Sequence, residues 1–187
     1  AVGIESDLSE KDKAVLRSIF DLTATIGDVV DNGDTFEDDD EPLTDAHKQS
    51  QQLCAQGVEL AEGGRLVEAR ALLDRAVQAA PDRAAAYNDR AQLLRLMEKD
   101  DESMADLDVA LKLTEGKRSR ARALALCQRG VLQRKRGADD DARAAFAEAA
   151  KLGSGFAKKQ VVQLNPYAAL CNKMLSQVMR GEKNITL

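Results

Sequence analysis

The sequence predicts an all-α fold, an α-solenoid of three stacked helical hairpins, on the strength of three observations. The chain of 187 residues has only 3% aromatic side chains and no Trp. A core built mainly from Ala and Leu favours close helix packing over sheets. Residues of matching type also recur in four separate series that share the same two steps along the chain, 34 and then 39. These are Gly57, Ala91 and Gly130; Ala69, Ser103 and Ala142; Leu73, Leu107 and Phe146; and Ala76, Ala110 and Ala149.

Residues 1–43 are acidic, and we expect them to form an N-terminal helix and a linker. Residues 1–47 carry 14 acidic and 3 basic side chains, whereas residues 48–187 carry 18 acidic and 24 basic ones. Ser9 suits a helix N-cap, and an apolar stripe at helical spacing follows it. That stripe is Val15, Ile19, Leu22 and Ile26. Because so short a helix is marginal alone, we expect it to dock on the repeats, within or beside their concave groove.

Residues 44–156 contain the three hairpins, at about 50–83, 84–117 and 123–156. Five additional residues separate the second hairpin from the third, so the first helix of the third is expected to start early. The turns within the hairpins are expected at Gly63-Gly64, at Glu98 to Asp100, and at Gly137.

The recurring residues have distinct physical roles in this arrangement. The small residues of the first series let the paired helices approach closely, and the larger ones fill the layers between them. The period of 34 and the order of these residues resemble the tetratricopeptide repeat. This resemblance implies a tetratricopeptide-repeat α-solenoid, curved so that the first helix of each repeat lines a concave face.

Residues 157–187 are expected to close the stack as a pair of capping helices and a tail. Asn165 suits an N-cap and Pro166 the first helical position, so the pair predicts the start of a new helix at an angle to the previous one. Its apolar face at helical spacing is Tyr167, Leu170, Met174 and Val178. Because a stack of hairpins leaves its ends open, we expect this face to cover the third hairpin.

Several stretches of the chain resemble one family in particular, tetratricopeptide repeat protein 36. They are AVLRSIF (14–20), GDVV (27–30), YNDRAQ (87–92), QRG (128–130), DDDAR (139–143) and LGSGFAKKQVVQLNPYAALCNKML (152–175). The last stretch is the most specific, since ordinary repeats do not carry it. The resemblance implies a non-enzymatic binding protein associated with the seventy-kilodalton heat-shock chaperone, and a connection with the turnover of a tyrosine-catabolic dioxygenase.

Candidate binding residues lie on the first helices of the second and third repeats. Asn and Gln on a concave face can hydrogen-bond the backbone of an extended peptide, and Arg and Lys can pair with its carboxylates. The predicted groove residues are Asn88, Gln92, Arg95, Gln128, Arg134 and Lys135. The sequence shows no phosphate-binding glycine loop, nucleophile–base pair or metal cluster, so we expect neither enzyme activity nor a cofactor.

The known mode of chaperone-tail binding does not fit this chain. Superfamily members that bind such tails use a two-carboxylate clamp of Lys, Asn and Arg side chains. The matching positions here are Cys54, Val58, Asp89, Leu124 and Gln128. None has the required type, and Asp89 would repel a carboxylate, so a chaperone partner would have to bind in another way.

Two interpretations of the binding surface stay open, an adaptor that uses its groove and a regulatory subunit or inhibitor that holds an enzyme through its outer surface. The basic run from Lys117 to Arg122 has no stacking aromatics, which disfavours nucleic acid. The sequence has no run of about 18 apolar residues, which disfavours a membrane span. Three widely spaced cysteines, Cys54, Cys127 and Cys171, are expected to be buried thiols and favour a reducing, cytoplasmic location.

Overall fold

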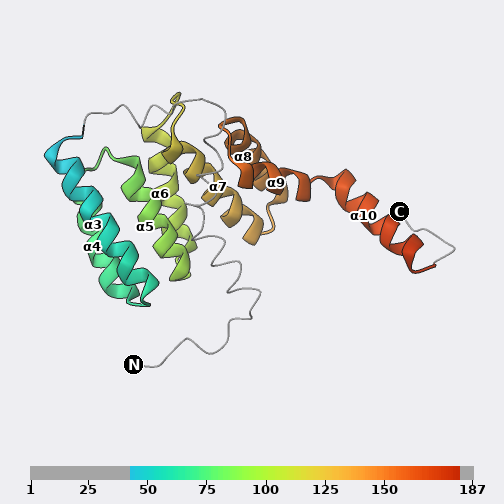
Figure 1. Cartoon of the computed structure of the whole chain (residues 1–187), viewed down its shortest axis with the longest axis horizontal. Coiled ribbons are helices and arrows are strands. Elements are labelled where there is room, and N and C mark those ends of the chain that lie inside the picture. Colours follow the sequence, from blue (N-terminus) through green and yellow to red (C-terminus); the bar gives the residue numbers. More distant parts are fainter. Residues whose placement is uncertain (1–42, 182–187) are drawn as a thin grey trace.

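The computed structural model describes residues 43–181, and this part of the chain folds into eight helices and no strand (Figure 1). The helices are α3 (Asp45–Glu62), α4 (Leu66–Ala79), α5 (Ala84–Leu96), α6 (Asp100–Leu113), α7 (Arg120–Lys135), α8 (Asp139–Lys151), α9 (Gly155–Gln163) and α10 (Pro166–Met179). The most extensive contacts join α3 to α4, α5 to α6 and α7 to α8, so the fold is the all-α stack of three hairpins that the sequence predicts.

Two glycines let the helices of a hairpin touch. A Cβ atom on Gly57 would lie 2.9 Å from Cγ and Cδ2 of Leu73, and one on Gly130 would lie 2.7 Å from Cε1 and Cζ of Phe146. Both separations are shorter than van der Waals contact, so a larger residue would push the helices apart. In the middle hairpin, Ala91 occupies the corresponding place and is fully buried. The small-residue series therefore has the packing role that its spacing predicts.

Each hairpin turns through one residue with a left-handed backbone. These residues are Gly64, with a φ of +79°, Glu98, with a φ of +59°, and Gly137, with a φ of +78°. They follow one another by the same two steps as the four packing series, 34 and then 39. Glycine adopts this conformation without steric cost, whereas Glu98 adopts it at a cost of about 1 kcal/mol. The second hairpin thus uses the same turn with a less suitable residue.

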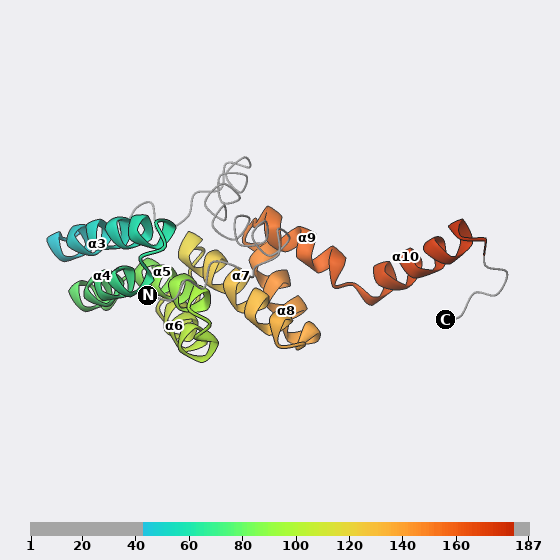
Figure 2. The same cartoon turned by 90° about the horizontal axis from the view of Figure 1, so that it is seen from below.

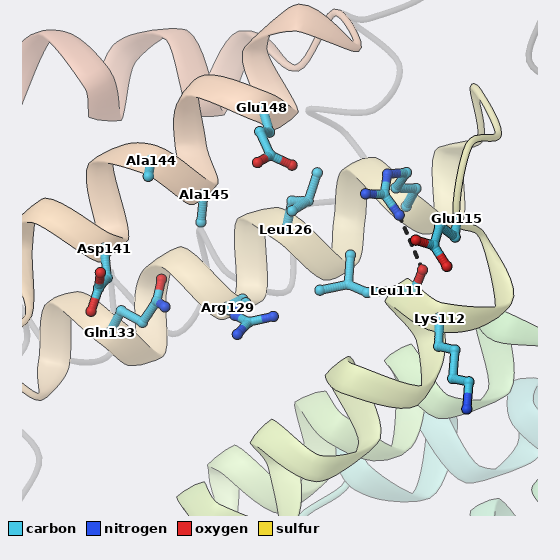
Figure 3. Close-up of a pocket in the computed structure, with 11 residues that line it drawn as sticks. Leu111, Lys112, Glu115, Leu126, Arg129, Gln133, Asp141, Ala144, Ala145 and Glu148 are labelled. Atoms are coloured by element: carbon cyan, nitrogen blue, oxygen red, sulfur yellow. Dashed lines mark hydrogen bonds between the residues drawn. The ribbon is translucent and has the colours of Figure 1, made fainter.

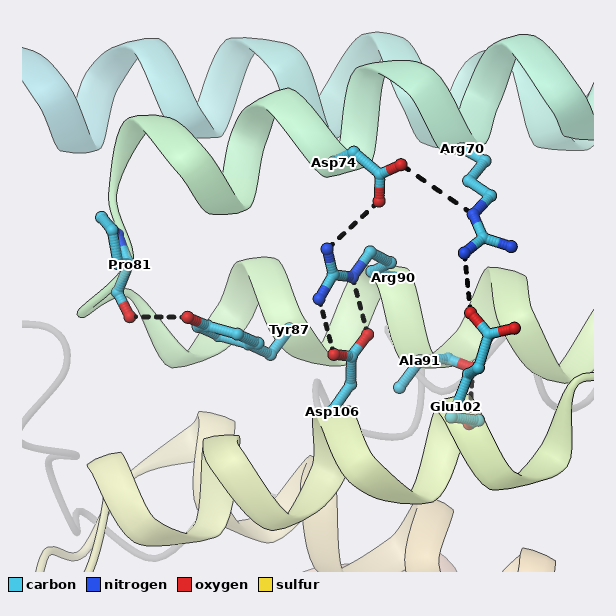
Figure 4. A network of polar contacts seen from close by, with 9 residues as sticks. Arg70, Asp74, Pro81, Tyr87, Arg90, Ala91, Glu102 and Asp106 are labelled. Atoms are coloured by element: carbon cyan, nitrogen blue, oxygen red, sulfur yellow. Dashed lines mark hydrogen bonds and ion pairs between the residues drawn. The ribbon is translucent and has the colours of Figure 1, made fainter.

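An arginine joins the first repeat to the second (Figure 4). Arg90 of α5 donates from Nε and Nη2 to both carboxylate oxygens of Asp106 on α6, at 2.8 and 2.7 Å, and from Nη1 to Asp74 on α4, at 3.1 Å. Nearby, Arg70 of α4 donates to Glu102 of α6 at 2.7 Å. The Arg90 side chain is only 22% exposed, so solvent screens these ion pairs less than it would on an open surface.

Helix α9 covers the apolar end of the third hairpin. Ser154 caps it, accepting a hydrogen bond from the backbone N–H of Ala157 at 3.1 Å. Ala157 is fully buried, and the ring of Phe156 meets that of Phe146 edge-on, with 5.9 Å between centroids. Since Val161 and Leu164 also pack on this cluster, α9 extends the core of the third hairpin by one layer.

Helix α10 leaves the stack instead of covering it (Figures 1 and 2). Its start is as predicted, because Asn165 Oδ1 accepts from the backbone N–H of Tyr167 at 2.9 Å and Pro166 is the first helical residue. The expected covering face lies largely in solvent, with Tyr167 79% and Val178 56% exposed. The prediction that this face closes the third hairpin is therefore corrected: α9 closes it, and α10 begins at the Asn-Pro pair and runs outward.

Some predictions concern segments that lie outside the described residues. The N-terminal helix after Ser9, its docking on the repeats and the tail beyond residue 181 are among them. Within residues 43–181, no helix has the length and apolar character that crossing a membrane requires.

Candidate protein-binding surfaces

The first helices of the hairpins form one face of the stack (Figure 2). Helix α5 contacts both α3 and α7, while the second helices α4, α6 and α8 approach one another less closely. A stack whose two layers are spaced unequally must curve toward its closer layer. The concave face is therefore lined by α3, α5 and α7, and the six groove residues predicted from the sequence belong to the last two of these helices.

Two of the predicted groove residues are buried between helices. Asn88 donates from Nδ2 to the backbone carbonyl of Ala121 at 2.9 Å, and Gln128 donates from Nε2 to the backbone carbonyl of Asn88 at 3.2 Å. Both side chains are fully buried. Their amide donors tie α5 to α7 in the described part of the chain, a role that helical spacing alone could not reveal.

The other four lie toward the C-terminal ends of α5 and α7. Gln92 is half-buried one turn before Arg95. Lys135 is exposed and pairs with Asp100, at 2.7 Å between Nζ and Oδ2. Arg134 is also exposed, and it donates from Nη1 to the side-chain oxygens of two α9 residues, at 2.6 and 3.4 Å. These acceptors are Gln160 and Gln163, which no sequence pattern assigns to the groove.

Arg95 differs from the other basic groove residues because it is buried. Only 8% of its surface is exposed, and none of its guanidinium nitrogens has a hydrogen-bond partner among the described residues. Burial lowers the pKa of Arg95 to about 10, partly offset by the nearby charge of Asp100. The side chain therefore still carries its positive charge at neutral pH.

The opposite end of the concave face holds a second polar cluster. The sequence analysis named two of its members, Cys54 and Asp89, as clamp positions but missed Ser50 and Arg83. Arg83 donates to Ser50 Oγ at 3.2 Å and to Cys54 Sγ at 3.5 Å. Burial, together with the charge of Asp89, raises the pKa of the Cys54 thiol to about 12, and burial raises the pKa of Asp89. Cys54 and Asp89 stand at positions of the two-carboxylate clamp, and their chemistry does not suit a carboxylate ligand.

The cysteines differ in their surroundings. Cys54 and Cys127 are buried, as expected, and burial raises the pKa of Cys127 to about 11. Cys171 on α10 is exposed, which corrects the expectation of a buried thiol there and follows from the outward direction of that helix.

The outer face carries a cleft of about 480 Å³ between the second and third repeats (Figure 3). It lies over α7, with α6 on one side and α8 on the other. Apolar surface comes from Leu111, Leu126, Ala144 and Ala145, and polar surface from Lys112, Glu115, Arg122, Arg129, Gln133, Asp141 and Glu148. The cleft therefore combines a small apolar floor with side chains of both signs of charge.

Within the described residues, no group of three or more His, Cys, Asp or Glu side chains is placed to hold a metal ion. What the concave face and the outer cleft present is peptide-sized surface with hydrogen-bond donors and charges, which suits recognition.

A curved stack of helical hairpins with this repeat register defines the class of tetratricopeptide-repeat proteins, which are protein-binding scaffolds. Solved structures of this class are similar in fold. The first such domain of Spaghetti (RPAP3), solved with the HSP90 peptide SRMEEVD, has a TM-score of 0.57 at 17% identity, over 66% of this chain and 95% of that one. The second domain of human RPAP3, solved with the HSP70 peptide SGPTIEEVD, has a TM-score of 0.54 at 21% identity, over 64% and 97%.

Sequence comparison narrows this class to a single family. The chain is 45% identical over 179 residues to tetratricopeptide repeat protein 36 of Danio rerio, and the match covers 94% of this chain and 95% of the relative. No protein-family model matches the chain. The chain belongs to the tetratricopeptide repeat protein 36 family.

Proposed function

We propose that the protein is a non-enzymatic adaptor whose concave groove binds an acidic, extended peptide segment of a partner protein. The observation that carries this proposal is an excess of positive charge at one end of the groove. Among the described residues, Arg95 and Lys135 share a single neighbouring carboxylate there, that of Asp100. Arg134 adds a third positive charge there and bonds only to neutral amides of α9 within the same part of the chain. A cationic groove attracts an acidic peptide at long range and pairs with it at contact. The peptides SRMEEVD and SGPTIEEVD, bound by proteins of similar fold, are acidic as well.

The first experiment measures binding of labelled SGPTIEEVD to the full-length chain by fluorescence anisotropy. The groove variant Arg134→Glu/Lys135→Glu reverses two exposed charges, and we expect it to weaken binding at least about tenfold. The matched control, Lys112→Glu/Arg129→Glu, makes the same charge change in the outer cleft and should stay within about twofold of wild type. Equal weakening by both variants would mean that net charge, and not the groove, governs binding.

A second candidate function is that of a regulatory subunit or inhibitor that holds an enzyme through its outer surface. The cleft over α7 favours it, because this cleft is large enough for side chains of a partner and is framed by three helices. The same pair of variants distinguishes the two functions in a pull-down from cytosol. A partner lost by the cleft variant and kept by the groove variant assigns binding to the outer face.

The family supplies a more specific proposal, that of a cytoplasmic cofactor of the seventy-kilodalton heat-shock chaperone that affects turnover of a tyrosine-catabolic dioxygenase. The basic groove supports an acidic chaperone tail as ligand, although it would bind at positions other than the two-carboxylate clamp. The test follows the half-life of the dioxygenase in cells that express wild type or the groove variant. An unchanged half-life, with chaperone binding lost, would separate the two activities.

A further inference from the structure

Helix α10 exposes a continuous apolar stripe to solvent. Tyr167 is 79% exposed, Leu175 58%, Val178 56% and Met179 80%, and these four make up half of the large apolar side chains that the described residues expose. Cys171 is exposed between them. At 3.6 residues per turn, the five side chains lie within about 120° of the helix circumference. The stripe is therefore one side of α10, along its whole length.

The other sides of α10 differ from the stripe. Leu170 and Met174, beside it, are half-buried, whereas the exposed Lys173 and Ser176 lie away from it. Pro166–Met179 contains no acidic residue, so no charge interrupts the stripe. An isolated helix of this length is marginal in water, and burial of its apolar side is what stabilises it. Helix α10 thus requires a surface that covers the stripe.

The stack does not present that surface at its nearest end. Helix α9 already covers the apolar end of the third hairpin, and α10 runs away from the stack after sparse contacts with α9 (Figures 1 and 2). A helix that projects in this way meets another molecule more readily than it meets its own repeats. The question is which molecule has a matching apolar side.

The stripe is symmetric about the middle of the helix, which allows it to pair with itself. Tyr167 and Met179 lie at equal distances on either side of position 173, and so do Cys171 and Leu175. In an antiparallel pair with its two-fold axis at this position, each Tyr167 ring meets Met179 of the second copy, and each Cys171 meets Leu175. A methionine sulfur beside an aromatic ring is a favourable contact. Every contact in the pair is made twice.

The exposed area of the stripe is sufficient for a specific pair. Its four large side chains together expose roughly 500–600 Å² per copy, near the upper limit of what a monomer leaves in contact with water. A pair that covers most of this area on both copies buries about 1,000 Å², the size at which specific association begins. An interface of this size has a Kd on the order of micromolar, so the pair forms and dissociates reversibly.

We propose that the protein forms a two-fold symmetric dimer in which α10 of one copy packs antiparallel against α10 of a second copy. The direction follows from the stack, which is attached to the N-terminal end of α10 through α9 (Figure 1). A parallel pair would bring both stacks to one end, where they would compete for the same space. An antiparallel pair separates the two attachment points by the length of the helix, about 21 Å.

The dimer goes beyond the proposed function and stands independently of what the groove binds. Because α10 leads away from the stack, its pairing leaves the concave faces of both copies uncovered (Figure 2). A dimer then offers two grooves to one partner, and the second binding event becomes intramolecular after the first.

Sedimentation velocity of the full-length chain, from about 1 to about 200 µM, tests the association and should show a monomer–dimer equilibrium. Leu175→Glu places a charge in the middle of the stripe and should raise the Kd of the dimer at least about tenfold. The matched control Val67→Glu puts the same charge at an exposed apolar position of α4 and should change this Kd less than about twofold. Both variants should bind SGPTIEEVD as wild type does, which separates dimerisation from the groove.

Disulfide formation determines the direction of the helices. In the antiparallel pair Cys171 faces position 175 of the second copy, so Leu175→Cys should give a covalent dimer on a non-reducing gel after oxidation with copper–phenanthroline. Lys173→Cys, with its thiol on the far side, should give none. Wild type should give none either, because the two copies of Cys171 are offset by four residues, about 6 Å along the helix, which a disulfide does not span.

Three results would overturn the proposal. One is a chain that stays monomeric at the highest concentration, and another is a dimer that Leu175→Glu leaves intact. The third is wild-type Cys171 that cross-links as fast as Leu175→Cys, since this requires a parallel pair. If the α10 amides of a monomer are protected from hydrogen exchange and deletion of residues 1–40 removes the protection, the stripe is covered by the N-terminal segment and not by a second copy.

Discussion

Replacing Gly130 by Ala tests the close contact on which the third hairpin depends. The added methyl would lie 2.7 Å from two ring carbons of Phe146, where ordinary contact begins at 3.4 Å. The ring is fully buried and held edge-on by Phe156, so it has little room to withdraw. Overpacking of this kind costs about 1–3 kcal/mol, and the better helix propensity of Ala returns about 1 kcal/mol.

The expected net result is a loss of up to about 2 kcal/mol in the free energy of unfolding, which lowers Tm by up to roughly 8 °C for a chain of this size. Urea denaturation followed by circular dichroism measures the first quantity and calorimetry the second. Gly155→Ala is the control, because a Cβ atom there has no neighbour within 4 Å and should leave the stability equal or slightly higher.

A second substitution identifies the cause of the loss. Gly130→Ala combined with Phe146→Leu reproduces the natural pair of the second hairpin, where Ala91 and Leu107 are both fully buried. The two changes should therefore couple favourably, by about 1 kcal/mol in a double-mutant cycle. Strict additivity, or a Gly130→Ala protein more stable than wild type, would refute the account of this contact.

Three other predictions concern a turn, an ion-pair network and the C-terminal helices. Glu98→Gly should raise the free energy of unfolding by about 0.5–1 kcal/mol, measured in urea, because glycine adopts the left-handed backbone without strain; a decrease would contradict this. Arg90→Leu should lower the free energy of unfolding by about 1–3 kcal/mol, because the ion pairs of Arg90 are shielded from solvent. The control Arg65→Leu, which removes an exposed arginine, should lower it by less than about 0.5 kcal/mol, and equal losses would show that the shielded ion pairs add no stability. Ending the chain after Leu164 should leave the Tm of the stack unchanged, whereas ending it after Gly153 should lower Tm and cause aggregation; a loss in the first case would mean that α10 supports the repeats.

The sequence predicts the fold well at positions where the packing admits only one type of residue. Gly57 and Gly130 recur at the repeat spacing because no side chain fits between the paired helices, and that requirement can be read from the sequence. For α10, the sequence predicts the start of the helix but not its direction. The Asn-Pro pair determines where a helix begins, while its path depends on which contacts α9 has already taken.

The candidate site is harder to predict, because polar residues on one helix face have several uses. Asn88 of α5 and Gln128 of α7 belong to the predicted groove face, as Arg134 does. Their side-chain amides, however, donate to backbone carbonyls of the neighbouring helix. Whether an amide meets a peptide or the next helix depends on the distance between α5 and α7, which no spacing in a single helix encodes. Helical spacing places Arg95 in the groove, but its burial becomes apparent only when the neighbouring helices are in place.

The outer cleft and the basic end of the groove are two sides of one junction, that between the second and third repeats. Helix α7 lies between them. One side of this helix, with Leu126 and Arg129, lines the cleft, whereas Arg134 and Lys135 of its last turn belong to the groove. The first junction is held by Arg90, which reaches from α5 to carboxylates on α4 and α6. If the third repeat tilts about α7, the outer cleft at the junction between the second and third repeats widens as the groove on the opposite face narrows. A ligand that widens the cleft or the groove would thus change the shape of the opposite face as well.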